Sequence, residues 1–122
     1  MNTITTDNEL ELIESKVDAL FEDDHYVQYA VSDDGNVTDL DSKAADGKCM
    51  FVSYGRPFYG GKQSETYVSR IVYCPQWKDV CLLAEEAIVK TNDAHHVFLE
   101  GIRFKMTNPE NGISVYELQM GS

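Results

Sequence analysis

The sequence predicts an α+β fold in which two helices accompany an antiparallel β-sheet of about five or six strands, in the order α-β-β-β-β-α-β-β. Two segments repeat apolar residues at helical spacing, and several shorter segments are rich in β-branched and aromatic residues. Short connections between the strands favour antiparallel neighbours, with both helices on one face of the sheet. We see no repeat or linker, so residues 1–122 are interpreted as a single domain.

The first helix is predicted at residues 7–22. Thr6 and Glu9 match the capping box at its start. Apolar residues at helical spacing form the stripe expected to be buried: Leu10, Ile13, Val17, Leu20 and Phe21. Four acidic residues occupy a separate arc of the same helix, and we call them the acidic ladder: Glu11, Glu14, Asp18 and Glu22.

A β-hairpin is predicted to follow this helix. Residues 26–32 have the β-branched and aromatic content of a strand, and residues 37–40 form a shorter one. The sequence Asp-Asp-Gly-Asn at 33–36 is typical of the tight turn between two such strands. Residues 41–47 are predicted to be a loop. The remaining strands are predicted at residues 49–54, 66–73, 97–106 and 113–120, the last two hinged at 108–112.

The second helix is predicted to begin after Pro75. Its apolar stripe is formed by Trp77, Val80, Cys81, Ala84, Ala87 and Ile88. Asp79 near its start and Lys90 near its end suit the helix dipole. Leu82 and Val89 lie off this face and are the first candidates for a self-association contact. The oligomeric state does not follow from the sequence.

Negative charge is concentrated in the first part of the chain. The protein has 21 acidic and 10 basic residues, which gives a net charge of −11. Residues 1–46 contain 13 acids and two bases, whereas residues 47–122 contain eight of each. Because concentrated like charge opposes folding, we interpret the acidic segment as a docking surface for a basic partner. The alternative is a solvated face that only keeps the protein soluble.

The spacing of the acidic ladder suggests what this surface imitates. Carboxylates four residues apart on a helix lie about 6 Å apart, close to the phosphate repeat of roughly 6–7 Å along one nucleic-acid strand. Acids near the hairpin extend the negative surface. The predicted partner-binding residues are Glu11, Glu14, Asp18, Glu22, Asp23, Asp24, Asp33, Asp34, Asp39 and Asp41. The predicted partner is a basic protein, a nuclease or a nucleic-acid-binding complex, and the charge argues against direct binding to nucleic acid or to a membrane.

The glycine-rich loop at residues 55–64 is a second candidate for recognition. Together with the residue before it, it supplies aromatic and cationic side chains of the kind found at interface hot spots: Tyr54, Arg56, Phe58, Tyr59 and Lys62. Two other interpretations are that the aromatics form a small satellite core, or that they stack on single-stranded bases. A phosphate-binding loop is excluded because Gln63 stands where that motif needs serine or threonine after the lysine.

Metal and catalytic sites find little support in the sequence. Cys74, Cys81, His95 and His96 contain metal-binding atoms, but their spacing does not match a zinc site. We interpret the three cysteines as reduced thiols. Acids that could attract calcium do not follow the EF-hand order: Asp33, Asp34, Asp39, Asp41 and Asp46. We therefore predict no metal, no cofactor and no catalytic residue.

These observations predict a non-enzymatic binding or inhibitor protein that occupies the basic nucleic-acid-binding surface of a partner as a nucleic-acid mimic. By analogy of size, charge and class, two settings fit: a phage anti-defence protein of the anti-CRISPR or anti-restriction kind, or a toxin immunity protein. The alternative is a small α+β enzyme or ligand-binding domain with a pocket at loop 55–64. The sequence shows neither a signal peptide nor a membrane-spanning apolar stretch, which predicts a cytoplasmic protein.

Overall fold

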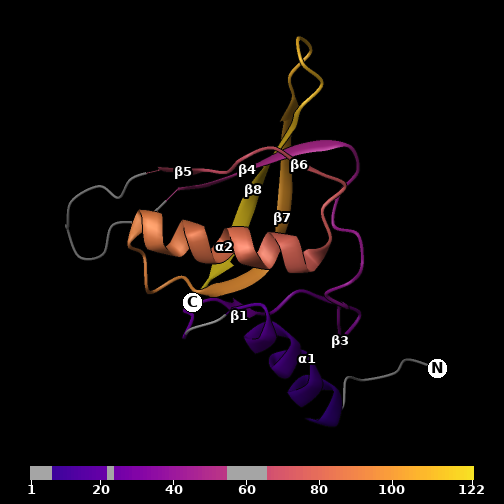
Figure 1. Cartoon of the computed structure of the whole chain (residues 1–122), viewed down its shortest axis with the longest axis vertical. Helices are drawn as coiled ribbons and strands as arrows, with labels where there is room; N and C mark the ends of the chain where they lie inside the picture. Colours follow the sequence, from indigo (N-terminus) through magenta and orange to yellow (C-terminus); the bar gives the residue numbers. More distant parts are fainter. Residues whose placement is uncertain (1–6, 22–23, 55–65) are drawn as a thin grey trace.

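The computed structural model describes residues 7–21, 24–54 and 66–122, which form two helices, a six-stranded sheet and a separate two-stranded sheet (Figure 1). This arrangement confirms the predicted α+β class. The helices are α1 (Asp7–Ala19) and α2 (Trp77–Thr91). The strands are β1 (Gln28–Tyr29), β2 (Ser32–Asp33), β3 (Asn36–Val37), β4 (Lys48–Tyr54), β5 (Thr66–Val68), β6 (Val72–Tyr73), β7 (Phe98–Thr107) and β8 (Ser114–Gly121).

The main sheet is mixed, so the prediction of an antiparallel sheet was wrong. Its strands lie in the order β1-β7-β8-β4-β5, and β6 also pairs with β4. The pairs β7–β8, β4–β5 and β4–β6 are antiparallel, whereas β1 runs parallel to β7 and β4 runs parallel to β8. Both parallel pairs join strands that are far apart in the chain, and the short connections on which the prediction rested say nothing about such pairs.

The first predicted strand is divided between two sheets. Gln28 and Tyr29 pair with β7, and Ala30 N donates to Leu99 O at 2.8 Å. The chain then leaves the main sheet, and β2 forms the predicted hairpin with β3 around Asp34 and Gly35. Both turn residues have positive φ, 50° and 81°, which the sequence Asp-Gly accommodates. The hairpin prediction is confirmed, but its strands are shorter than expected and lie outside the main sheet.

A serine interrupts the strand predicted at residues 66–73. Ser69 N donates to Phe51 O, and Phe51 N donates to the hydroxyl of Ser69, both at 2.8 Å. The Ser69 hydroxyl thus accepts a hydrogen bond from β4 that a backbone carbonyl of a paired strand would otherwise accept. The predicted strand therefore appears as β5 and β6, which pair with successive parts of β4.

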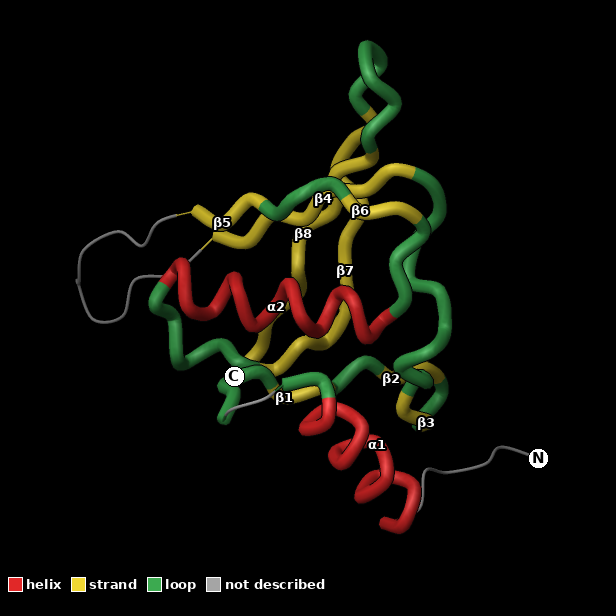
Figure 2. The backbone as a smooth tube through the Cα atoms, viewed as in Figure 1, coloured by secondary structure: helices red, strands yellow, loops and turns green. Residues whose placement is uncertain are grey.

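α2 crosses one face of the sheet and supplies much of the core (Figure 2). Most of its predicted stripe is buried, although Trp77 is only partly so. Leu83, which the predicted stripe omitted, is fully buried as well. Asp79 accepts the Gln76 N–H at 2.9 Å at the helix start. Of the two residues placed off the stripe, Leu82 is partly buried and Val89 is 64% exposed.

α1 lies beyond β1, away from the part of the sheet that α2 crosses (Figure 1). The expectation that both helices cover one face is therefore not met. Val17 is buried in the core, and Ile13, Leu20 and Phe21 pack against it. The helix ends at Ala19, before the predicted end at residue 22. Thr6 of the predicted capping box lies outside the described residues.

Neither of the two described helices is long and apolar enough to cross a lipid bilayer.

Candidate functional site

The acidic residues predicted to bind a partner are at the surface wherever their side chains are described. This holds for Glu11, Glu14, Asp18, Asp24, Asp33, Asp34, Asp39 and Asp41. Glu22 and Asp23 lie outside the described residues. Three members of the acidic ladder therefore stand on α1. The predicted docking surface, defined from here on as the exposed acids of α1 and of residues 24–41, is open to solvent.

Ion pairs within the chain divide this surface into two kinds of acid. Asp39 lies 3.9 Å from Lys16 Nζ, which connects α1 to the segment after the hairpin, and Asp41 lies 3.3 Å from Lys78 Nζ on α2. By contrast, Glu11, Glu14, Asp33 and Asp34 form no ion pair with any other described residue. No cation of the described part of the chain pairs with their charge, which leaves it available to an external cation. Surface pairs such as those of Asp39 and Asp41 are worth less than about 1 kcal/mol and exchange readily with a new partner.

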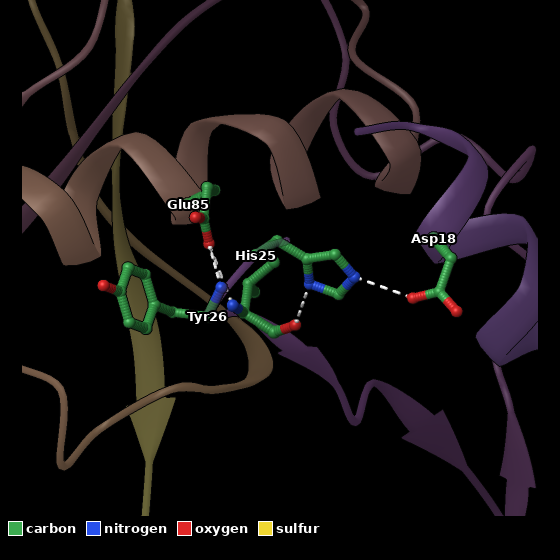
Figure 3. Close-up of polar contacts among 5 residues, drawn as sticks. Asp18, His25, Tyr26 and Glu85 are labelled. Atoms are coloured by element: carbon green, nitrogen blue, oxygen red, sulfur yellow. Dashed lines mark hydrogen bonds and ion pairs between the residues drawn. The ribbon is translucent and has the colours of Figure 1, made fainter. Parts of the chain in front are cut away.

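Asp18 is held by a histidine that the sequence analysis did not single out. His25 Nε2 lies 2.7 Å from Asp18 Oδ1, and His25 Nδ1 lies 3.0 Å from the backbone oxygen of Val27 (Figure 3). Both contacts are to acceptors, so the arrangement is fully satisfied when both ring nitrogens carry hydrogen. The ring also stacks on Phe21 at 4.6 Å between centroids. His25 therefore fixes the end of α1 to the chain that follows it.

A carboxylate from α2 anchors the same segment. Glu85 Oε1 accepts the backbone N–H groups of Tyr26 and Val27, each at 2.9 Å (Figure 3). Glu85 is separated from these residues by almost half the chain, and no spacing rule connects them. We call this set of contacts the Glu85 clamp. With His25 it connects α1 to the helix that covers the sheet.

The second predicted recognition element is described only at its first residue. Tyr54 is exposed, and Lys105 Nζ lies 4.9 Å from the centre of its ring. Arg56, Phe58, Tyr59 and Lys62 lie outside the described residues. The arrangement gives Tyr54 a cation–π partner within the chain.

A cavity of about 190 Å³ lies beside Tyr54, where the parallel strands β4 and β8 diverge. Buried Asp93 and partly buried His96 contribute polar groups to its lining, and Ser53 lies on the β4 side. His96 Nδ1 lies 2.8 Å from each carboxylate oxygen of Asp93. Crevices at the carboxyl ends of parallel strands are common ligand sites in α/β sheets.

The cysteines and histidines do not form a cluster. Cys49 and Cys81 are buried and Cys74 is exposed, and all three are free thiols. Burial, with a smaller contribution from Glu85, raises the pKa of the Cys81 thiol to about 12. His95 and His96 lie in the turn after α2. Among residues 7–21, 24–54 and 66–122 no three potential ligands of the His, Cys, Asp or Glu type are placed to hold a metal ion.

Comparison with known proteins gives no match for this chain among family models, curated proteins or solved structures. Inference about its function therefore depends on its own residues and their arrangement.

Proposed function

We propose that this protein is a non-enzymatic binding protein that docks its acidic surface on the basic nucleic-acid-binding surface of a partner protein. One observation carries the proposal: the whole net charge of −11 comes from residues 1–46, and every described acid of the predicted docking surface is exposed. A protein that needed charge only for solubility would gain the same benefit from acids spread over both parts of the chain.

The arrangement of the acids supports a macromolecular partner. α1 lies at the β1 edge of the main sheet, away from α2 (Figure 2), and its described acids are exposed. Glu11 and Glu14 are one helical turn apart, a separation comparable to that of successive phosphates. A field of this kind raises the association rate with a basic protein by roughly 10- to 1000-fold at low ionic strength.

Two biological settings fit such a partner. A phage anti-defence protein would occupy the nucleic-acid channel of a host complex, and an immunity protein would cover the cationic active site of a nuclease toxin. Both act in the cytoplasm on a partner whose surface is built for phosphate groups.

A small enzyme or ligand-binding domain is the second candidate, and the cavity beside Tyr54 favours it. In that cavity Asp93 orients the imidazole of His96 through Nδ1, an arrangement that general bases use. Replacing His96 with Gln should then abolish thermal stabilisation by a small-molecule ligand. The charge distribution has no role in this second candidate, which is why we place it second.

The test of the proposed function uses the full chain as bait in a lysate of its native host at low salt, followed by binding measurements with the purified partner. We expect affinity to fall steeply as salt rises from about 50 to 200 mM, and duplex DNA to compete. The variant Glu11→Gln with Asp33→Asn should bind at least about tenfold more weakly.

The matched control is Glu100→Gln with Glu110→Gln, which removes the same charge from exposed positions in the electrically neutral part of the chain. It should change affinity by less than about twofold. The proposal would be overturned if the affinity of the partner were the same at low and high salt, with and without competing DNA, and for the wild type and the variant Glu11→Gln with Asp33→Asn.

A further inference from the structure

A cleft of about 300 Å³ separates α1 from β1 and the start of β7. β1 pairs with β7 in parallel, with Gln28 opposite Phe98, and both residues line the cleft. Ile13 and Val17 form the helix side of the cleft. The walls thus combine apolar and aromatic side chains with polar ones, and Phe98 is 40% exposed.

Two acids of the docking surface stand on the helix side of this cleft. Glu14 lines it and forms no ion pair with another described residue, and Asp18 lines it one turn further along α1. Asp18 is 74% exposed at its side chain and gives only one oxygen to His25. Figure 3 shows its second oxygen pointing away from the imidazole ring. The cleft therefore combines apolar side chains with two carboxylate groups that can accept further hydrogen bonds.

The charges around the cleft define the sign of its occupant. Among the described residues that line the cleft, His25 is the only side chain that can carry a positive charge, and Asp18 already faces it. Glu14 has no such partner among the described residues, so the lining has an uncompensated negative charge. That charge disfavours an anion or a nucleic acid, and a purely apolar side chain would make no hydrogen bond with Glu14 or Asp18.

We propose that this cleft receives one arginine side chain of the partner protein, an inference that rests on the proposed function. The methylene stem packs on Ile13 and Val17, the guanidinium donates to Glu14 and Asp18, and its flat face stacks on the exposed ring of Phe98. Arginine fits better than lysine because its planar group stacks on aromatic rings, contacts two carboxylates at once and is more weakly hydrated.

A second copy of this chain is a poorer source of that arginine. In the described part of the chain Arg70 lies 2.9 Å from Glu86 and Arg103 pairs with Glu117, so an arginine of a second copy would exchange one carboxylate partner for another. Two copies would also bring together two surfaces of the same negative charge. The arginine belongs to a basic partner instead.

The test compares two single variants that remove the same charge from the same helix. Glu14→Gln changes a residue that lines the cleft, whereas Glu11→Gln changes a ladder residue outside it. The probe is a nonapeptide of alternating lysine and glycine with arginine at its centre, and the second probe has lysine at that position. Binding is followed by NMR on the methyl groups of Ile13 and Val17, and circular dichroism verifies that both variants keep their helix content.

We expect the arginine probe to bind the wild-type protein at least about fivefold more tightly than the lysine probe, and to shift the methyl resonances of Ile13 and Val17. Glu14→Gln should weaken that binding about tenfold. Glu11→Gln removes a charge of the docking surface outside the cleft and should weaken it about threefold, whereas Glu110→Gln, outside the docking surface, should weaken it less than about twofold.

Equal weakening by both variants, with no preference for arginine, would overturn the cleft while leaving a diffuse acidic docking surface intact. Tight binding of the arginine probe without any shift at Ile13 or Val17 would overturn it too. If neither probe binds, and if the purified partner binds the variant Glu11→Gln with Asp33→Asn as tightly as the wild-type protein, the proposed function fails together with the cleft.

Discussion

Replacing Glu85 with Ala tests how α1 is attached to the rest of the molecule. The carboxylate accepts the N–H groups of Tyr26 and Val27, each at 2.9 Å. Val27 is fully buried, so its N–H has no access to water when the acceptor is removed, whereas the N–H of exposed Tyr26 can turn to solvent. One buried N–H is thus left without a partner.

An unsatisfied buried donor costs about 1–3 kcal/mol, and the lost hydrogen bonds were made to a charged acceptor. We therefore expect Glu85→Ala to lower the free energy of unfolding by about 2–3 kcal/mol. For a chain of this length that corresponds to a fall in Tm of about 8–12 °C. Glu85→Gln keeps an oxygen in the same place, and its loss should be only about 1 kcal/mol.

The measurement is thermal and urea unfolding followed by circular dichroism, with Glu110→Ala as the control. Glu110 is exposed in the turn between β7 and β8, and its side chain makes no ion pair with a described residue. The clamp would be refuted as the attachment of α1 if the Glu85→Ala protein were as stable as the control. The same conclusion would follow if the Glu85→Gln protein were no more stable than the Glu85→Ala protein.

Two further predictions concern the core. Leu83→Ala removes a fully buried side chain of α2 and should lower the free energy of unfolding, measured in urea, by about 2–5 kcal/mol. Val89→Ala, at a 64% exposed position, should lower it by less than about 1 kcal/mol, and similar losses for the two variants would contradict the orientation of α2. At pH 8 a thiol reagent should modify only exposed Cys74 in the native protein and all three cysteines after unfolding. The reason is that Cys49 and Cys81 are buried and that the pKa of Cys81 is raised to about 12. Rapid reaction of two thiols in the native protein would count against this packing.

Local sequence patterns predicted the elements whose structure depends on neighbours in the chain. The stripe from Val80 to Ile88 and the acid at Asp79 identify α2, and Asp34 with Gly35 identifies the hairpin turn. Strand direction could not be predicted in this way. The parallel pairing of Cys49 with Ser114 joins residues on opposite sides of α2 in the sequence, and side-chain alternation is the same in parallel and antiparallel strands.

In the candidate site, too, local features could be predicted from the sequence, whereas features that depend on contacts distant in the chain could not. Exposure of acids such as Glu11 and Asp33 follows from their residue type and from the amphipathic pattern of α1. The cleft required knowledge of which strand lies beside β1, since only the β1–β7 pairing brings Phe98 next to Gln28. Glu85 gave no signal, because a carboxylate that accepts two distant backbone N–H groups looks like any helix-surface glutamate in the sequence.

The strand order of the main sheet also determines when, during synthesis, the acidic surface reaches its final position. β1 cannot pair until Phe98 has been made, and β4 gains its parallel neighbour only with Ser114 and the residues after it. Because the chain is made from its N-terminal end and a domain folds as a unit, α1 leaves the ribosome long before β7 and β8 are available to complete the domain. A nascent chain therefore carries its acids on a segment without a fixed place. The predicted docking surface and its cleft therefore depend on the completed sheet. A product truncated before β8 would keep the acidic residues but would lack the sheet that positions them.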